Sequence, residues 1–153
     1  MGNYYINPNI NITTDASVFE SFYRNGMRPG MLRKEKIVNL RRATQIYQDD
    51  FLPNFFGDSW LDNQRTYYHL AYLQAVIELL PLLYQEQAYS EMYSLSSDAL
   101  LYEPENGDIH FWHIRSMLNL GGHVVAQKHF AQHIQKLSDE QKDFLESILY
   151  GHH

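Results

Sequence analysis

The fold is decided by one stretch, residues 92–137, which reads MYSLSSDALLYEPENGDIHFWHIRSMLNLGGHVVAQKHFAQHIQKL. Its pattern predicts a helix, a turn that contains Pro104, a second helix, a turn at Gly121-Gly122 and a third helix. Proline cannot continue a helix, because it lacks the amide hydrogen and its ring clashes with the preceding turn. Glycine ends a helix readily, because it reaches left-handed backbone dihedrals at little steric cost.

The third helix carries one apolar stripe. Ala126, Phe130, Ile134 and Leu137 follow one another at i, i+4, i+8 and i+11, so they share one face of a helix. That face predicts packing against the helix that precedes the glycine turn.

The stretch also repeats itself. An offset of 34 residues places Met92 on Ala126 and Ser96 on Phe130, and it also places Leu80 on Ile114 and Leu83 on Met117. This offset is the period of the tetratricopeptide repeat, in which each unit is a pair of antiparallel helices. The sequence therefore predicts stacked helical hairpins.

N-terminal to this block, the pattern predicts further helices and loops. Residues 1–14 are expected to form an extended lead-in, and Thr14 or Asp15 is expected to cap a short helix. Asn25-Gly26 and Pro29-Gly30 indicate a loop. A second helix is expected from Arg33 to about Asp49.

A long helix is expected to follow a loop at residues 51–57, starting at Trp60 with Asp58 or Ser59 as its N-cap. Pro81 is expected to kink this helix or to end it early. After Leu137, the residues Ser138 to Gln141 form a capping-box pattern for a last helix.

We therefore predict an all-α fold, a tetratricopeptide-like stack of antiparallel helix pairs with about seven helices. The whole chain, 1–153, is expected to be one domain. Within it, residues 15–137 carry the repeats, and residues 138–150 form a C-terminal helix that covers the open end of the stack.

The charge balance limits the classes of function. The formal net charge is −6 with histidine neutral, which argues against a free-standing nucleic-acid binder. The mainly basic tract at residues 33–36 (RKEK), together with Arg41 and Arg42, is interpreted as a solvated helix face. The chain has no cysteine, which excludes disulfides and thiolate metal sites and fits a reducing compartment.

The sequence gives no sign of a membrane segment. Residues 1–10 lack the basic start and apolar run of a signal peptide. The longest apolar segment, 75–84, contains Glu78 and Pro81 and is too short to span a bilayer. We expect a cytoplasmic protein without a membrane partner.

Several segments match one family in order and spacing. They are residues 15–20 (DASVFE), Ala43 with residues 47–53 (YQDDFLP), residues 58–60 (DSW) with Arg65, and residues 102–104 (YEP) with His110, Met117 and Gly121. Together they resemble the bacterial transcriptional activator domain. This tetratricopeptide-like module follows a winged-helix DNA-binding domain in antibiotic-pathway regulators and related response regulators. Asp49 departs from the pattern, because the family usually has glycine there.

The resemblance implies oligomerisation, signal reception or contact with the transcription machinery, and it implies neither catalysis nor a cofactor. The chain would be the C-terminal part of a longer regulator. Its partners would be proteins, and it would reach nucleic acid only through a winged-helix domain that this sequence lacks. An alternative from another class is a helical domain that senses a small-molecule effector.

A repeat of this kind lines its inner groove with residues of the first helix of each pair. We therefore place a candidate groove for a peptide or effector on seven residues. These are Gln74, Ile77, Tyr84, Asp108, Phe111, Arg115 and Asn119.

Histidines offer a third hypothesis, a metal site. His110 and His113 are three residues apart, and His129 and His133 are four apart, so each pair shares one helix face. Since no Asp or Glu lies between His129 and His133 as in zinc proteases, we favour ordinary surface or seam histidines and assign no metal. Asp49-Asp50 is interpreted as a solvated helix end rather than an acid–base pair.

Overall fold

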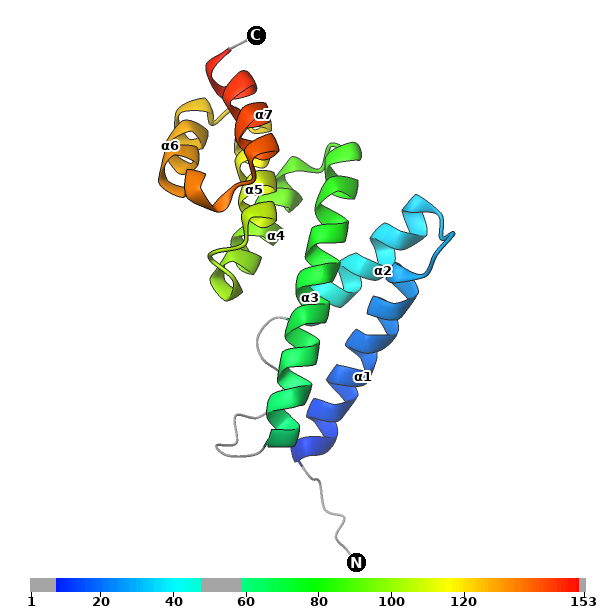
Figure 1. Cartoon of the computed structure of the whole chain (residues 1–153). Helices are drawn as coiled ribbons and strands as arrows, with labels where there is room; N and C mark the ends of the chain where they lie inside the picture. Colours follow the sequence, from blue (N-terminus) through cyan, green and yellow to red (C-terminus); the bar gives the residue numbers. More distant parts are fainter. Residues whose placement is uncertain (1–7, 48–58, 152–153) are drawn as a thin grey trace, which may run out of the picture. The chain divides into compact units, whose positions relative to one another are not determined.

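The computed structural model describes the backbone of residues 8–47 and 59–151 and the side chains of residues 15–47 and 63–151. Within these ranges the structure is all-α, with seven α-helices, one short 3-10 helix and no strand (Figure 1). This confirms the predicted class and number of helices. The elements are α1 (Pro8–Met27), α2 (Arg33–Ile46), α3 (Ser59–Gln85), α4 (Tyr89–Tyr102), α5 (Gly107–Asn119), α6 (His123–His133), η2 (Ile134–Lys136) and α7 (Asp139–Tyr150).

The chain divides into two compact units, Met1–Ala75 and Val76–His153. In the first unit, α1 packs on α2 around an aromatic cluster. The Phe19 ring lies 5.6 Å from Tyr47, and Tyr47 stacks on Tyr72 at 4.4 Å between centroids. Burial of such rings is a main source of stability in a small helical unit, because each removes a large apolar area from water.

Two predictions for the first unit are wrong. Residues 8–14 are helical rather than extended, since α1 begins at Pro8, where the fixed φ of proline suits the first helical position. The pair Asn25-Gly26 does not end the helix, which continues to Met27. A Cβ at Gly26 would lie 2.5 Å from Leu40 Cδ2, so this glycine lets α1 approach α2 closely.

Of the two outcomes expected at Pro81, the early end of α3 is wrong, because the helix continues to Gln85, and the kink stays a prediction. Proline removes one helical hydrogen bond. Leu79, Leu80 and Leu83 around it are fully buried, and their packing outweighs that loss. The predicted loop at 51–57, Asp49-Asp50 and residues 1–7 of the lead-in lie outside the described residues.

In the second unit, α4 packs on α5, α5 on α6, and α6 on α7. One core joins the last three helices. Its buried members are Ile114, Met117, Ala126, Phe130, Leu137, Leu145 and Leu149. The last helix therefore covers the core of its own chain.

The turns predicted at Pro104 and at Gly121-Gly122 are confirmed, because they separate α4 from α5 and α5 from α6. After the first turn the Asn106 side chain accepts a hydrogen bond from the Ile109 amide at the start of α5, and Gly121 has a φ of +90° after the end of α5. Ser138 and Gln141 form the reciprocal capping box of α7. The third helix of the deciding stretch ends as an α-helix at His133, and η2 carries the chain on to Leu137, which is still buried.

No helix in the described ranges is long and apolar enough to cross a bilayer.

Candidate functional site: a histidine cluster and an arginine-aromatic surface

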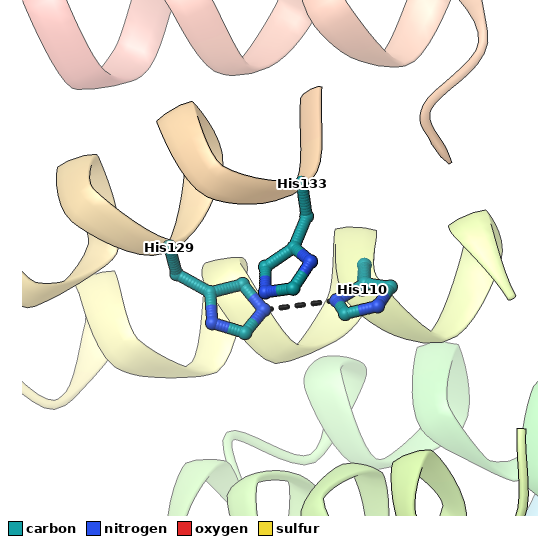
Figure 2. A group of neighbouring side chains, drawn as sticks. All are labelled: His110, His129 and His133. Carbon is teal, nitrogen blue, oxygen red and sulfur yellow. Dashed lines mark hydrogen bonds between the residues drawn. The ribbon is translucent and has the colours of Figure 1, made fainter. Parts of the chain in front are cut away.

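The four histidines singled out from the sequence meet between α5 and α6. His110 and His113 lie on α5 and are buried, with 2% and 5% of their surfaces exposed. His129 and His133 lie on α6 and are half-buried. One ring nitrogen each from His110, His129 and His133 lies within 4.8 Å of the other two. Figure 2 shows these three rings gathered between the two helices.

His110 is held by both of its ring nitrogens. Its Nε2 lies 2.6 Å from the carbonyl oxygen of Pro104, which can only accept, so Nε2 carries the proton. Its Nδ1 is then an acceptor, and it lies 2.9 Å from His129 Nε2, which donates to it. The turn that Pro104 forms therefore fixes the tautomer of His110.

His133 completes the group. Its ring stacks on that of His110 with centroids 4.2 Å apart and lies 4.3 Å from that of His129. Its Nδ1 lies 3.0 Å from Lys136 Nζ, and Lys136 also forms an ion pair with Glu105 at 3.4 Å. Since Nδ1 meets the lysine, Nε2 is the nitrogen that His133 turns toward the other two rings (Figure 2).

His113 belongs to a separate hydrogen-bond pair. Its Nδ1 lies 2.7 Å from the Ser96 hydroxyl on α4, which is fully buried. The same hydroxyl donates to the Met92 carbonyl at 2.8 Å, so it accepts from His113. This pair joins α4 to α5 in the core of the second unit.

Replacing Ser96 with alanine is expected to lower the free energy of unfolding by about 1 to 2 kcal/mol, because it leaves a buried imidazole N–H without an acceptor. Urea denaturation of Ser96→Ala measures this loss. Ser147→Ala serves as the control, because Ser147 is partly exposed and bonds only to the carbonyl of Phe144. Equal stability of Ser96→Ala and the parent would contradict the assigned hydrogen bond.

Burial keeps the cluster neutral. Desolvation, with repulsion between the rings, lowers the pKa of His113 to about 4 and that of His129 to about 3. Desolvation also lowers the pKa of His110 and of His133, and the Lys136 ammonium adds to both effects. At neutral pH all four rings are therefore uncharged, which is the form that binds metal ions.

The folded protein is expected to lose stability as the pH falls from 6.5 toward 4. The unfolded chain binds protons near the ordinary pKa of 6.5, whereas folded His113 and His129 stay neutral to about 4 and about 3. The unfolded state then holds more protons in this window, so acid favours it. Thermal unfolding of the metal-free chain across the window measures the effect, and His123→Gln, at an exposed position of α6, should retain it. A melting temperature that stays constant over this window would contradict the lowered pKa values.

A second feature of this unit is an arginine surrounded by aromatic rings, which we call the Arg115 cluster. The Arg115 guanidinium carbon lies 4.1 Å from the centroid of Tyr84, 5.4 Å from Phe111 and 4.9 Å from Trp112. It lies 4.8 Å from Phe144 on α7, which is 40% exposed. An arginine guanidinium above an aromatic ring is attracted by the partial negative charge on the face of the ring. The cluster is thus a preformed surface of cationic and aromatic character.

The structure brings three of the seven predicted groove residues, Tyr84, Phe111 and Arg115, into this cluster. The sequence did not assign Trp112 or Phe144 to the groove. Phe111 and Trp112 meet edge to face at 5.2 Å, and Phe111 also contacts Phe144 at 5.8 Å. The aromatic residues of the last helix could have suggested that this helix contributes to the surface, but they were not assigned to the groove.

The side chains of the other four predicted groove residues do not belong to the cluster. Asp108 accepts a hydrogen bond from the Gln141 side chain at 2.8 Å, and Asn119 donates to the Arg115 carbonyl. Ile77 is half-buried on α3. Gln74 belongs to the first unit, where it accepts from the Tyr23 hydroxyl at 2.9 Å. The groove as a whole remains a prediction.

The first unit has an open hollow of about 400 Å³ at the turn between α1 and α2. None of the seven predicted groove residues lines it. Its lining residues are Asn25, Arg28, Met31, Lys34, Glu35, Val38 and Asn39.

Comparisons of the chain with models of protein families, with curated proteins and with solved structures gave no match.

Proposed function

We propose that this chain is a protein-interaction and oligomerisation domain of a bacterial transcriptional regulator. It would present helical pairs of the tetratricopeptide type to a second copy or to the transcription machinery. A winged-helix domain outside this sequence would bind DNA. In this proposal the domain is cytoplasmic, has no catalytic role and couples a signal to DNA occupancy.

The observation that carries the proposal is the agreement between the sequence repeat and the helices. Helices α4 and α6 begin 34 residues apart, at Tyr89 and His123, which is the offset found in the sequence. Equivalent positions are buried in both helices, Met92 and Ser96 in α4 and Ala126 and Phe130 in α6. The 34-residue offset of the sequence repeat therefore relates positions that are buried in both helices.

Four of the residues on which the family resemblance rests have a role in packing or in a turn. Tyr47 is buried in the aromatic cluster of the first unit, and Met117 is buried in the core of the second. His110 is buried beside the Pro104 turn, and Gly121 has the positive φ that favours glycine. These four residues of the pattern each have a packing or turn role, which supports the resemblance.

The Arg115 cluster supports the contact role. Arginine and aromatic residues are enriched among the residues that contribute most to binding energy at protein interfaces. The cluster contains Tyr84, Phe111 and Arg115 from the predicted groove, and it is half-buried with Phe144 exposed at its edge. A partner would complete the burial of these rings.

Sedimentation analysis tests the proposal. The average molar mass measured in solution should rise when the protein concentration is increased roughly hundredfold, or the chain should bind purified bacterial RNA polymerase holoenzyme. Asn119→Arg, which places a bulky charge at an exposed groove position, should weaken that association. Gln132→Arg, the same kind of change at an exposed position of α6 outside the groove, should not. A chain that remains monomeric and does not bind the polymerase would refute the contact role.

A further inference from the structure

We propose that His110, His129 and His133 form a binding site for one divalent transition-metal ion, with Zn²⁺ as the ion that best fits the site. The ligand atoms are Nδ1 of His110 and Nε2 of His129 and His133. The proposal rests on the geometry of the second unit and does not depend on the proposed function.

The positions of the three nitrogens are close to those of a zinc site. Zinc–nitrogen bonds of about 2.0–2.1 Å in a tetrahedron place the ligand nitrogens about 3.3 Å apart. Here His110 Nδ1 and His129 Nε2 are 2.9 Å apart, and one ring nitrogen from each of the three histidines lies within 4.8 Å of the other two. Small rotations of the half-exposed His133 side chain bring its nitrogen into range.

The surroundings of His110 favour metal binding. In protein metal sites, a histidine ligand almost always donates its second ring N–H to a carbonyl or carboxylate, which fixes the ring and its tautomer. Nε2 of His110 already donates to the Pro104 carbonyl at 2.6 Å, so the lone pair of Nδ1 points toward His129. A metal ion would replace the proton that now joins these two rings, and His129 would carry its own proton on Nδ1 instead.

The ligand set defines the class of ion. Three neutral imidazoles suit Zn²⁺, Cu²⁺ and Ni²⁺, and they exclude Ca²⁺ and Mg²⁺, which prefer oxygen ligands. Three protein ligands leave a fourth position for water or for a ligand from a partner. His129 and His133 are half-buried rather than buried, so the ion has a route from solvent.

The ion would join two segments of the second unit. His110 lies in the first turn of α5, and His133 ends α6 just before η2. Lys136 opposes the ion in two ways. Its ammonium donates to His133 Nδ1, so the proton of this ring now lies on Nε2 and would have to move to Nδ1 before Nε2 could bind the ion, and its positive charge lies beside the site. The structure therefore assigns Lys136 a role that weakens metal affinity.

Isothermal titration of the full chain with ZnCl₂ tests the site, using protein made without an affinity tag and freed of metal by a chelator. We expect about one ion per chain. His129→Gln and His133→Gln should each lower the affinity by about a hundredfold or more, because a lost ligand costs at least as much as a lost supporting contact. Lys136→Gln should bind zinc more tightly than the parent. Zinc should also raise the melting temperature of the parent, because it binds only the folded site.

His123→Gln is the matched control, since His123 is exposed on the same helix outside the cluster. It should bind zinc as the parent does. Circular dichroism of each variant checks folding, and His133→Gln, at the more exposed ligand, decides the result if His129→Gln does not fold. The proposal is overturned by no zinc uptake, by equal affinity in His133→Gln and the parent, or by loss of binding in His123→Gln. If only the terminal His152 and His153 held the zinc, His133→Gln would bind zinc with the same affinity as the parent.

Discussion

Replacing Phe130 with alanine is expected to lower the free energy of unfolding of the second unit by about 3 to 5 kcal/mol. Phe130 is 3% exposed and belongs to the core that contains Ile114 on α5 and Leu145 on α7. The alanine would leave a cavity among side chains that three helices hold in place, so the surroundings would collapse only partly. A loss of this size is a large fraction of the stability of a small protein.

Urea denaturation combined with hydrogen exchange of α5–α7 amides measures the effect. Hydrogen exchange assigns the change to this unit rather than to the first. Val125→Ala is the matched control, because Val125 lies on the same helix and is 57% exposed. It should change stability by less than about 0.5 kcal/mol. A loss below about 1 kcal/mol for Phe130→Ala would show that Phe130 does not fill the core as described.

In the second unit, the helix caps and turns that depend only on residues close together in the sequence were predictable. The Asn106 cap, the Gly121 turn and the capping box of Ser138 and Gln141 each need only residues within one helical turn. Of the predicted stripe, Ala126 and Phe130 are buried on α6 as the helical period requires, whereas Ile134 is half-buried on η2 and Leu137 is buried beyond it. Local chemistry is enough to place these elements.

The wrong predictions share a different cause. Gly26 and Pro81 are helix breakers by propensity, yet both lie inside helices. A close contact between α1 and α2 requires glycine at position 26, and buried leucines on both sides of Pro81 stabilise the end of α3. Packing between distant segments decided both positions, and no local pattern records such packing.

The histidine cluster could be predicted only in part. The spacing of each pair on its own helix was evident, so two rings on one face of α5 and two on one face of α6 were expected. Which of them meet depends on the register between the helices. That register leaves His113 with Ser96 and joins His110 to His129 and His133. The sequence interpretation favoured ordinary surface or seam histidines because no acidic residue lies between His129 and His133, and spacing alone does not give this register.

The Arg115 cluster was also predicted only in part. Tyr84, Phe111 and Arg115 were placed on one groove because they lie in first helices of predicted pairs. Phe144 was not, because it lies on the last helix, which was expected only to cover the end of the stack. The packing of α7 on the core brings its exposed edge to the arginine.

Gly107→Ala is expected to lower the free energy of unfolding of the second unit by about 3 kcal/mol, the upper end of the range for overpacking. A Cβ at Gly107 would clash with the carbonyl oxygen of Lys136 and would lie 3.6 Å from the Leu137 Cα. Both neighbours are backbone atoms, which cannot rotate away as a side chain does. Helix α5 would have to separate from η2.

The sign of the change makes this test decisive. The φ of Gly107 is not in the positive region, so its backbone suits alanine. Without the clash, glycine to alanine would therefore stabilise the chain by about 0.4 to 1 kcal/mol. Urea denaturation distinguishes the two signs directly. Since Gly107 precedes His110 by one helical turn and Lys136 follows His133, the same separation should move His110 away from His133 and weaken zinc binding in the titration. A stabilised variant would mean that α5 and η2 do not lie in contact, and the three imidazoles would then lack the support that holds them together.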